Sequence, residues 1–147
     1  MLDGCIPWPP EREARYRAAG YREGLTLWAM VARTVARLPH KVALVAGERR
    51  ETYAELDRAS ARLGAALRRQ GIRALDRVVL QLPNIPEFVH WYLALVRIGA
   101  IPVLALRAHR ATEVRHFISA SGAVAYVVPD VAHHFDYRPM ATQMQGE

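Results

Sequence analysis

Apolar and polar positions in the middle of the chain follow a strand–helix–strand pattern. Residues 78–82 form a short apolar run rich in β-branched side chains, which is typical of a strand buried on both faces of a parallel sheet. Residues 85–98 are apolar almost all round a helix, and their polar side chains mainly follow one narrow stripe. After Gly99, which suits a helix end, residues 101–106 begin a second strand. The pattern predicts a right-handed βαβ unit.

Upstream of this unit, the chain predicts a helix, a hairpin and a second, longer helix. Residues 27–38 place apolar side chains at helical spacing behind Thr26, which is a suitable N-cap. Two short strand-like runs on either side of a Gly-Glu turn predict a hairpin over residues 42–53. Thr52 and Glu55 then fit a capping box, in which each side chain accepts a hydrogen bond from the other residue's backbone N–H. This capping box begins the longer helix.

Downstream, the pattern predicts one more helix, over residues 112–121, and a third parallel strand, over residues 124–128. Residues 133–147 start like a helix that Asp136 is placed to cap. Three parallel strands with two crossovers are half of a doubly wound sheet. We therefore expect an α/β fold: a partial doubly wound parallel sheet with flanking helices and an N-terminal hairpin.

The composition supports a single folded unit with an arm in front of it. A chain of 147 residues with 52% hydrophobic residues has the length of one domain and can bury a core. Residues 1–24 contain three prolines and little periodicity, so we expect an arm there, with the unfinished α/β layer over residues 25–147. The single cysteine, Cys5, excludes an intramolecular disulfide. Because no secretory signal and no membrane-spanning run is present, we expect a cytoplasmic protein that does not associate with membranes.

The net charge of +6 alone would allow a nucleic-acid partner. The arginines, however, are scattered along the predicted helices and often have an acidic residue nearby, as Arg58 has Glu55. No basic run has the length that is typical of a nucleic-acid-binding tail. We therefore expect no nucleic-acid partner.

Ligands of open parallel sheets bind beyond the carboxyl ends of the strands. This rule selects three candidate binding residues, namely Asn84, His109 and Arg110. Asn84 has a structural alternative, because it fits an N-cap before a proline in the first turn of the helix. For His109 and Arg110, the structural alternative to ligand binding is a solvated loop in which Arg110 pairs with Glu113.

The sequence lacks the motifs that usually carry catalysis or cofactor binding. It contains no GxGxxG, no GxxxxGK[ST], no GxSxG and no HExxH, and no glycine-rich loop follows a predicted strand. The histidines show no spacing that would join them to each other or to a carboxylate around a metal ion. The residues by themselves therefore identify no catalytic, cofactor-binding or metal-binding residue.

Two segments resemble the first two core motifs of the adenylate-forming superfamily, which includes acyl-CoA synthetases and peptide-synthetase adenylation domains. These segments are residues 51–56 (ETYAEL) and 95–103 (LVRIGAIPV). Further segments resemble the stand-alone aryl-acid adenylating enzymes of siderophore pathways: residues 4–9 (GCIPWP), 15–21 (RYRAAGY), 79–84 (VLQLPN), the pair His109–Arg110, and 135–138 (FDYR). One position departs from this branch, because Arg107 stands where a proline is usual.

The resemblance implies an ATP- and Mg²⁺-dependent 2,3-dihydroxybenzoate–AMP or salicyl-AMP ligase. Such an enzyme converts the aryl acid to its adenylate and transfers it to the phosphopantetheine thiol of an aryl carrier protein. In the family, the phosphate loop, the ribose-binding acid and the catalytic lysine lie beyond the position of Glu147. Residues 25–147 are then an incomplete N-terminal subdomain, so we expect the chain alone to be inactive and to bind no cofactor tightly.

Two other functions remain open from the sequence. The chain could be a free-standing, non-catalytic α/β module that binds or interacts with a partner. It could also be a fragment of a generic acyl-CoA ligase. The sequence does not separate 2,3-dihydroxybenzoate from salicylate as the acid, because the resemblance places the acid-binding pocket outside this chain.

Overall fold

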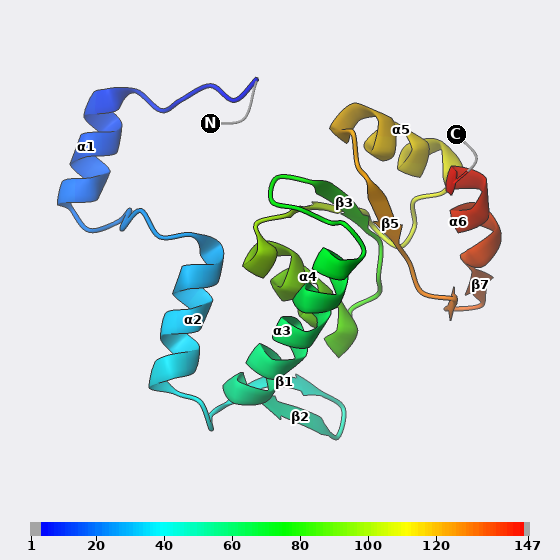
Figure 1. Ribbon diagram of the computed structural model, residues 1–147, viewed down its shortest axis with the longest axis horizontal. Helices are drawn as coiled ribbons and strands as arrows, with labels where there is room; N and C mark the ends of the chain where they lie inside the picture. Colours follow the sequence, from blue (N-terminus) through cyan, green and yellow to red (C-terminus); the bar gives the residue numbers. More distant parts are fainter. Residues whose placement is uncertain (1–3, 146–147) are drawn as a thin grey trace.

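Three parallel strands form the centre of the computed structural model, which describes residues 4–145 (Figure 1). Strands β3 (Arg77–Leu80), β4 (Ile101–Leu104) and β5 (Ala125–Val127) lie in the order β4-β3-β5. Strand β3 pairs in parallel with both neighbours. Its three apolar residues have no exposed surface, namely Val78, Val79 and Leu80. The predicted parallel sheet with a central strand buried on both faces is therefore confirmed.

Helices α3 (Tyr53–Arg69) and α4 (Pro86–Ile98) cover one face of this sheet. The predicted capping box of α3 is confirmed: Thr52 Oγ1 accepts from the backbone N–H of Glu55 at 3.3 Å, and Glu55 Oε2 accepts from that of Thr52 at 2.8 Å. The two helices pack closely at Gly64, where a Cβ atom would lie 3.1 Å from a side-chain carbon of α4. A small residue there lets the helices cross at short range.

Helices α5 (Ala111–Ser121) and α6 (Arg138–Gln145) lie on the opposite face, beside β5 (Figure 1). Asp136, the expected cap of the last helix, lies two residues before the first helical residue, Arg138, and its Oδ1 accepts from the backbone N–H of Arg138 at 3.0 Å. The buried residues of this side come from α5, α6 and the residue before α6, namely Val114, Tyr137 and Met140. Helices thus cover both faces of the sheet, as the predicted doubly wound layering requires.

One small element was not predicted, a hairpin between the last strand and the last helix. Strands β6 (Val131–Ala132) and β7 (Phe135–Asp136) pair antiparallel. Their turn consists of His133 and His134, whose φ angles of 48° and 65° are in the left-handed region. Strands of two residues are too short to give a periodic signal, which is why the pattern showed only the end of a strand and the start of a helix.

The N-terminal part contains a second helical element and the predicted hairpin. Helix α2 (Leu27–Arg37) begins as expected behind Thr26, whose hydroxyl accepts from the backbone N–H of Ala29 at 3.1 Å. Strands β1 (Val42–Ala46) and β2 (Arg49–Thr52) pair antiparallel and lead directly into α3. The hairpin therefore holds the start of α3 at the lower end of the molecule in Figure 1.

The segment before α2 is extended away from the sheet. It contains helix α1 (Pro10–Ala18), which has no buried residue and stands apart from the rest of the chain in Figure 1. Residues 1–3 of the expected arm lie outside the described residues.

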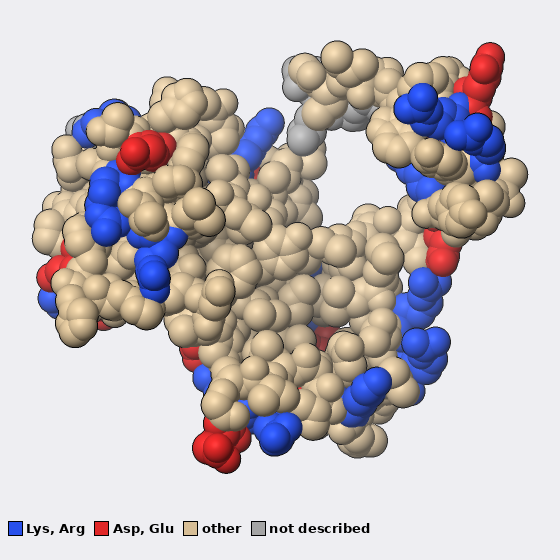
Figure 2. Space-filling model, turned by 180° about the vertical axis from the view of Figure 1, so that it is seen from behind, with Lys and Arg blue, Asp and Glu red and all other residues tan. Residues whose placement is uncertain are grey.

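Two surface features bear on possible partners. On the face seen in Figure 2, Lys and Arg side chains form separate small groups over several elements. Such a distribution differs from the continuous basic stripe that is typical of nucleic-acid-binding domains. Within residues 4–145, no helix combines the length and the apolar character needed to cross a membrane.

Candidate functional site

The carboxyl ends of β3 and β4 meet at one edge of the sheet, around the buried side chain of Gln81. Gln81 directly follows β3 and is 1% exposed. Its Nε2 donates to the carbonyl oxygens of Leu106 (2.7 Å) and His109 (3.0 Å), and its Oε1 accepts from the hydroxyl of Tyr126. Because each polar atom of this buried amide has a partner, Gln81 ties the loop after β4 to the centre of the sheet.

The loop after β4 also holds itself together through His109. The His109 Nδ1 accepts from the backbone N–H of Leu106 at 3.0 Å, and its ring meets the ring of Phe117 edge-on at 5.0 Å. An imidazole whose Nδ1 accepts a backbone hydrogen bond carries its proton on Nε2. His109, a candidate from the sequence, is therefore placed to shape the loop.

Arg110, the second candidate, also contacts its own loop. Its guanidinium donates to the carbonyl oxygens of Arg107 and His109, both at 2.9 Å, and lies 4.0 Å from the centre of the Phe135 ring. Glu113 contacts Arg110 through the backbone: its carboxylate accepts from the Arg110 N–H at 2.9 Å. This hydrogen bond at the start of α5 lowers the pKa of Glu113 below its usual value.

Of the two phenols behind this loop, Tyr137 is buried and Tyr126 is half-buried. Tyr137 is 1% exposed, and its hydroxyl donates to the carbonyl oxygen of Arg107 at 3.0 Å. Burial, with a smaller contribution from Tyr137, raises the pKa of Tyr126 well above its usual value, so the Tyr126 hydroxyl remains a protonated donor at neutral pH. Together with Gln81, the two tyrosines hold the loop from the side of the sheet.

Asn84, the third candidate, does not cap α4, so the capping alternative is wrong. The N-cap of α4 is Ile85, with φ −123° and ψ 159°, and no side chain caps this helix end. The residue before a proline avoids helical backbone angles, so Pro86 places its neighbour Ile85 at the cap and moves Asn84 outside the helix. The Asn84 side chain is exposed at the strand end.

A cavity of about 560 Å³ opens at this edge, and we call it the strand-end cleft. It is lined by residues that follow β3, the start of α4, the end of β4 with its loop, and the β6–β7 turn: Leu82, Pro83, Asn84, Phe88, Leu104, Ala105, Leu106, Arg107 and His133. Of the three candidates, only Asn84 lines it. Asn84 shares the lining of this cleft with Arg107 and His133, whereas His109 and Arg110 hold the loop after β4 in shape.

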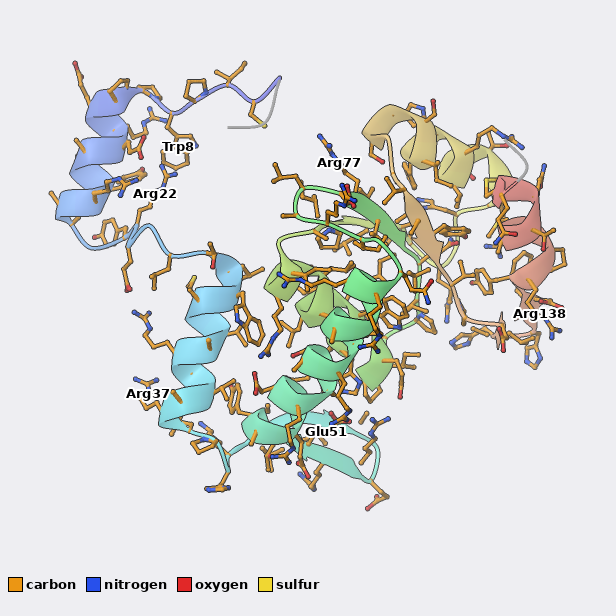
Figure 3. The ribbon with its side chains drawn as sticks, viewed as in Figure 1. Trp8, Arg22, Arg37, Glu51, Arg77 and Arg138 are labelled. Atoms are coloured by element: carbon orange, nitrogen blue, oxygen red, sulfur yellow. The ribbon has the colours of Figure 1, made fainter. Side chains whose placement is uncertain are left out.

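A second polar cluster, which the sequence did not reveal, joins the hairpin to α4. Glu51 on β2 is 8% exposed, and its Oε2 lies 2.7 Å from Nε2 of His90 on α4 (Glu51 is labelled in Figure 3). Arg49 bridges to Glu87 at 2.7 Å, and this hydrogen bond lowers the pKa of Glu87. These residues lie 38 and 39 positions apart, so no local motif could have indicated the pairing.

A metal ion or a nucleotide phosphate needs a specific arrangement of protein groups around it. Within residues 4–145, no group of three or more His, Cys, Asp or Glu side chains is arranged to hold a metal ion. The turns that follow β3 and β4 at the sheet edge contain no glycine whose backbone could approach a phosphate closely. These two turns therefore offer no glycine-rich cradle for a phosphate.

Comparison with known proteins assigns the family. A sequence model of the AMP-binding enzyme family matches residues 31–146, from within α2 to the end of α6. The chain belongs to the AMP-binding enzyme family. The adenylate-forming resemblance read from the two motifs at residues 51–56 and 95–103 is thus confirmed, because both motifs lie inside the matched range.

Three curated relatives match nearly the whole chain. Triostin synthetase I of Streptomyces triostinicus is 49% identical over 98% of this chain, and the salicyl-AMP ligase / salicyl-S-ArCP synthetase of Mycobacterium tuberculosis is 47% identical over 99%. The 2,3-dihydroxybenzoate-AMP ligase of Bacillus subtilis is 41% identical over 100%. The chain spans about 27% of the length of each of these relatives.

A solved structure confirms the fold. The apo structure of MbtA from Mycobacterium smegmatis matches 96% of this chain with a TM-score of 0.87 and 40% identity, and the matched part is 26% of that protein. The predicted partial α/β sheet is thus the arrangement found in the corresponding part of MbtA. Because 96% of 147 residues is about 141, most of the arm is included in the match.

Proposed function

We propose that this chain is the N-terminal part of an aryl-acid–AMP ligase that activates 2,3-dihydroxybenzoate or salicylate for siderophore biosynthesis. The supporting observation is the extent of the similarity. The family model begins at residue 31, whereas the dihydroxybenzoate and salicylate ligases match 100% and 99% of the chain. The similarity to aryl-acid ligases therefore includes the arm, which the general family model does not describe. This favours the aryl-acid branch over a generic acyl-CoA ligase.

The proposed reaction has two steps. A carboxylate oxygen of the aryl acid attacks the α-phosphorus of ATP, which forms the aryl adenylate and releases pyrophosphate. A thiol then attacks the acyl carbonyl carbon, which forms a thioester and releases AMP. Mg²⁺ belongs to the proposal as the ion that accompanies ATP, and none of the described residues is assigned to it. The described residues provide the sheet, its covering helices and the strand-end loop as a scaffold.

The proposed acceptor of the acyl group is the phosphopantetheine arm of an aryl carrier protein. The name of the Mycobacterium tuberculosis relative, salicyl-S-ArCP synthetase, supports this acceptor. The division of the chain into an arm at residues 1–24 and a subdomain at residues 25–147 is part of the same proposal. Under it, the subdomain is incomplete, and the acid-binding and phosphate-binding residues belong to later parts of the ligase.

Chimeric ligases test this function. In the salicyl-AMP ligase and in the 2,3-dihydroxybenzoate-AMP ligase, the matching first part is replaced by this chain. We expect both chimeras to catalyse ATP–pyrophosphate exchange that depends on the aryl acid, and each to keep the acid preference of its recipient. The 147-residue chain alone, and each recipient without its first part, serve as controls and should show no exchange.

Three results would contradict the proposal. Exchange by the 147-residue chain alone would show that it holds a complete site. Folded chimeras without exchange would show that the chain cannot serve as this part of the ligase. A chimera whose acid preference differs from that of its recipient would place the acid-binding residues in this chain. Circular dichroism and gel filtration of each chimera separate loss of function from loss of fold.

A further inference from the structure

Strand β5 is an edge strand of the described sheet. In the order β4-β3-β5, it pairs with β3 on one side, and within residues 4–145 no strand pairs with its other side. Each of its faces packs against a core cluster: Ala125 and Val127 on the side of α3 and α4, and Tyr126 on the side of α5 and α6. Packing on both faces is typical of a strand inside a parallel sheet, whereas the open main-chain groups of β5 are those of an edge.

A groove of about 460 Å³ opens beside the start of this strand, and we call it the β5 groove. It lies between the end of α5, the start of β5 and the end of α6, and none of the described residues that line it carries a charge. Val124 is 58% exposed in it, although its backbone N–H donates to the carbonyl oxygen of Arg77 at 2.9 Å. An uncharged groove beside open main-chain groups suits an added strand, which brings apolar side chains as well as hydrogen-bond partners.

Helix α6 runs back along β5, against the direction of the strand. At its beginning, the hydroxyl of Tyr137 donates to the carbonyl oxygen of Arg107 at 3.0 Å, beyond the carboxyl end of β4. Near its other end, Met144 lines the β5 groove together with Ala123 and Val124, which precede β5. In a βαβ unit, the helix returns the chain to the end of the sheet at which the first strand began. Helix α6 therefore has the position and direction of a crossover helix that follows β5 (Figure 1).

The two complete crossovers of the sheet indicate where such a crossover leads. The step from β3 to β4 carries α4 on one face, and the step from β4 back across β3 to β5 carries α5 on the other. Because the two steps go in opposite directions over opposite faces, they have the same hand, as crossovers in parallel sheets nearly always do. Helix α6 lies on the same face as α5. A crossover of the same hand through α6 therefore continues in the direction from β4 to β5 and reaches the open edge of β5.

We propose that the open edge of β5 receives a further parallel strand, which comes from the segment of the ligase that follows α6. The proposal rests on the proposed function, under which the polypeptide continues beyond this chain, as in relatives of which the chain spans about 27%. The new strand extends the order β4-β3-β5 on the β5 side and covers Val124. It makes β5 an interior strand, as the packing on both of its faces requires.

Amide hydrogen exchange on a lengthened chain tests the proposal. The 147-residue chain is compared with a form lengthened at its C-terminus by the segment that follows the matching part in the 2,3-dihydroxybenzoate-AMP ligase of Bacillus subtilis, up to and including the first apolar, β-branched run. We expect the amides of β5 to exchange about tenfold more slowly or less in the lengthened form, because a second neighbour protects them. The amides of β4, at the opposite edge, should keep their rates.

Two exposed valines provide matched variants. Val124 is 58% exposed in the β5 groove, whereas Val131 on β6 is 55% exposed and is not among the residues that line the groove. In the lengthened form, Val124→Lys should restore fast exchange in β5, because a lysine at a strand edge opposes the addition of another strand. Val131→Lys should leave the slow exchange as it is. In the 147-residue chain, neither substitution should change the exchange of β5.

The proposal is overturned if β5 exchanges equally fast in both folded forms, or if β4 becomes slow in place of β5. It is also overturned if Val124→Lys and Val131→Lys have the same effect in the lengthened form. Protection of β5 in the 147-residue chain that increases with chain concentration, together with a dimer in gel filtration, would overturn it in favour of a second copy at this edge.

Failure of this proposal is distinct from failure of the proposed function. If the lengthened form does not fold, the chimeric ligases replace it, with hydrogen exchange followed by mass spectrometry. A chimera without ATP–pyrophosphate exchange can still protect β5, and an active chimera can leave β5 unprotected. The two readouts are therefore independent, and unprotected β5 in a folded chimera overturns the added strand alone.

Discussion

The arm and the sheet-centred part of this protein are stabilised in different ways. In the sheet-centred part, the three apolar residues of β3 are fully buried and α4 contributes five buried residues. In the arm, α1 has no buried residue, and Ile6 and Tyr21 are 92% and 82% exposed. Figure 3 shows Trp8 and Arg22 on the arm, away from the sheet.

The arm is held by local contacts. The rings of Trp8 and Tyr16 meet edge-on at 5.3 Å, and those of Tyr16 and Tyr21 at 6.1 Å. Arg17 pairs with Glu13 one helical turn away, at 3.0 Å. Exposed pairs of this kind contribute little stability, typically below about 1 kcal/mol each. The same chain therefore contains one part that is stabilised by burial and another that is stabilised by contacts between residues close in sequence.

The largest expected effect comes from removing a side chain at the centre. Leu95 of α4 has no exposed surface and packs in the cluster between α3, α4 and the sheet. Leu95→Ala should lower the free energy of unfolding by roughly 2–5 kcal/mol, because it leaves a cavity in a packed core. The matched arm variant, Tyr21→Ala, should change it by no more than about 0.5 kcal/mol. Urea denaturation followed by circular dichroism measures the free energy of unfolding of both variants. Similar losses of stability in the two would show that the arm and the sheet-centred part are not stabilised differently.

A smaller effect is expected at the start of α3. Thr52→Ala removes the hydroxyl of the capping box and should lower the free energy of unfolding by about 1 kcal/mol. Helix α1 has no such cap, since the side chain of Pro9 accepts no hydrogen bond. Thr52→Ser keeps the hydroxyl and is the control. Equal stability of the Ala and Ser variants in urea denaturation would show that the capping box does not stabilise the fold.

The smallest effect concerns the link between the arm and α2. Arg33 hydrogen-bonds to Glu23 and lowers the pKa of that carboxyl from 4.5. Because the folded pKa is lowered, the contact stabilises the arm above the unfolded pKa and is lost as the pH falls through the folded value. The carboxyl carbon shift of Glu23 should therefore titrate below pH 4.5, and Arg33→Gln should bring the midpoint back toward 4.5. Unchanged titration in the variant would exclude this link.

Much of the fold could be predicted because it depends on local patterns. The apolar run of β3, the all-round apolar helix α4 and the capping box at Thr52 were found where the periodicity and the capping rules placed them. The candidate site was predicted less well. The strand-end rule pointed to the edge of the sheet where the strand-end cleft lies, but only Asn84 of the three candidates lines this cleft, and the capping alternative for Asn84 was wrong.

The sequence by itself determined the order of the longer helices and strands, the caps at Thr26 and Thr52 and the family motifs, since these follow from side chains close together along the chain. Only the tertiary structure decided that Gln81 holds the loop after β4, that His90 meets Glu51, and that Arg107 is left without a described side-chain partner. These contacts join residues 25 to 39 positions apart. They depend on strand order and helix packing, because the chain must cross the sheet before such side chains can meet.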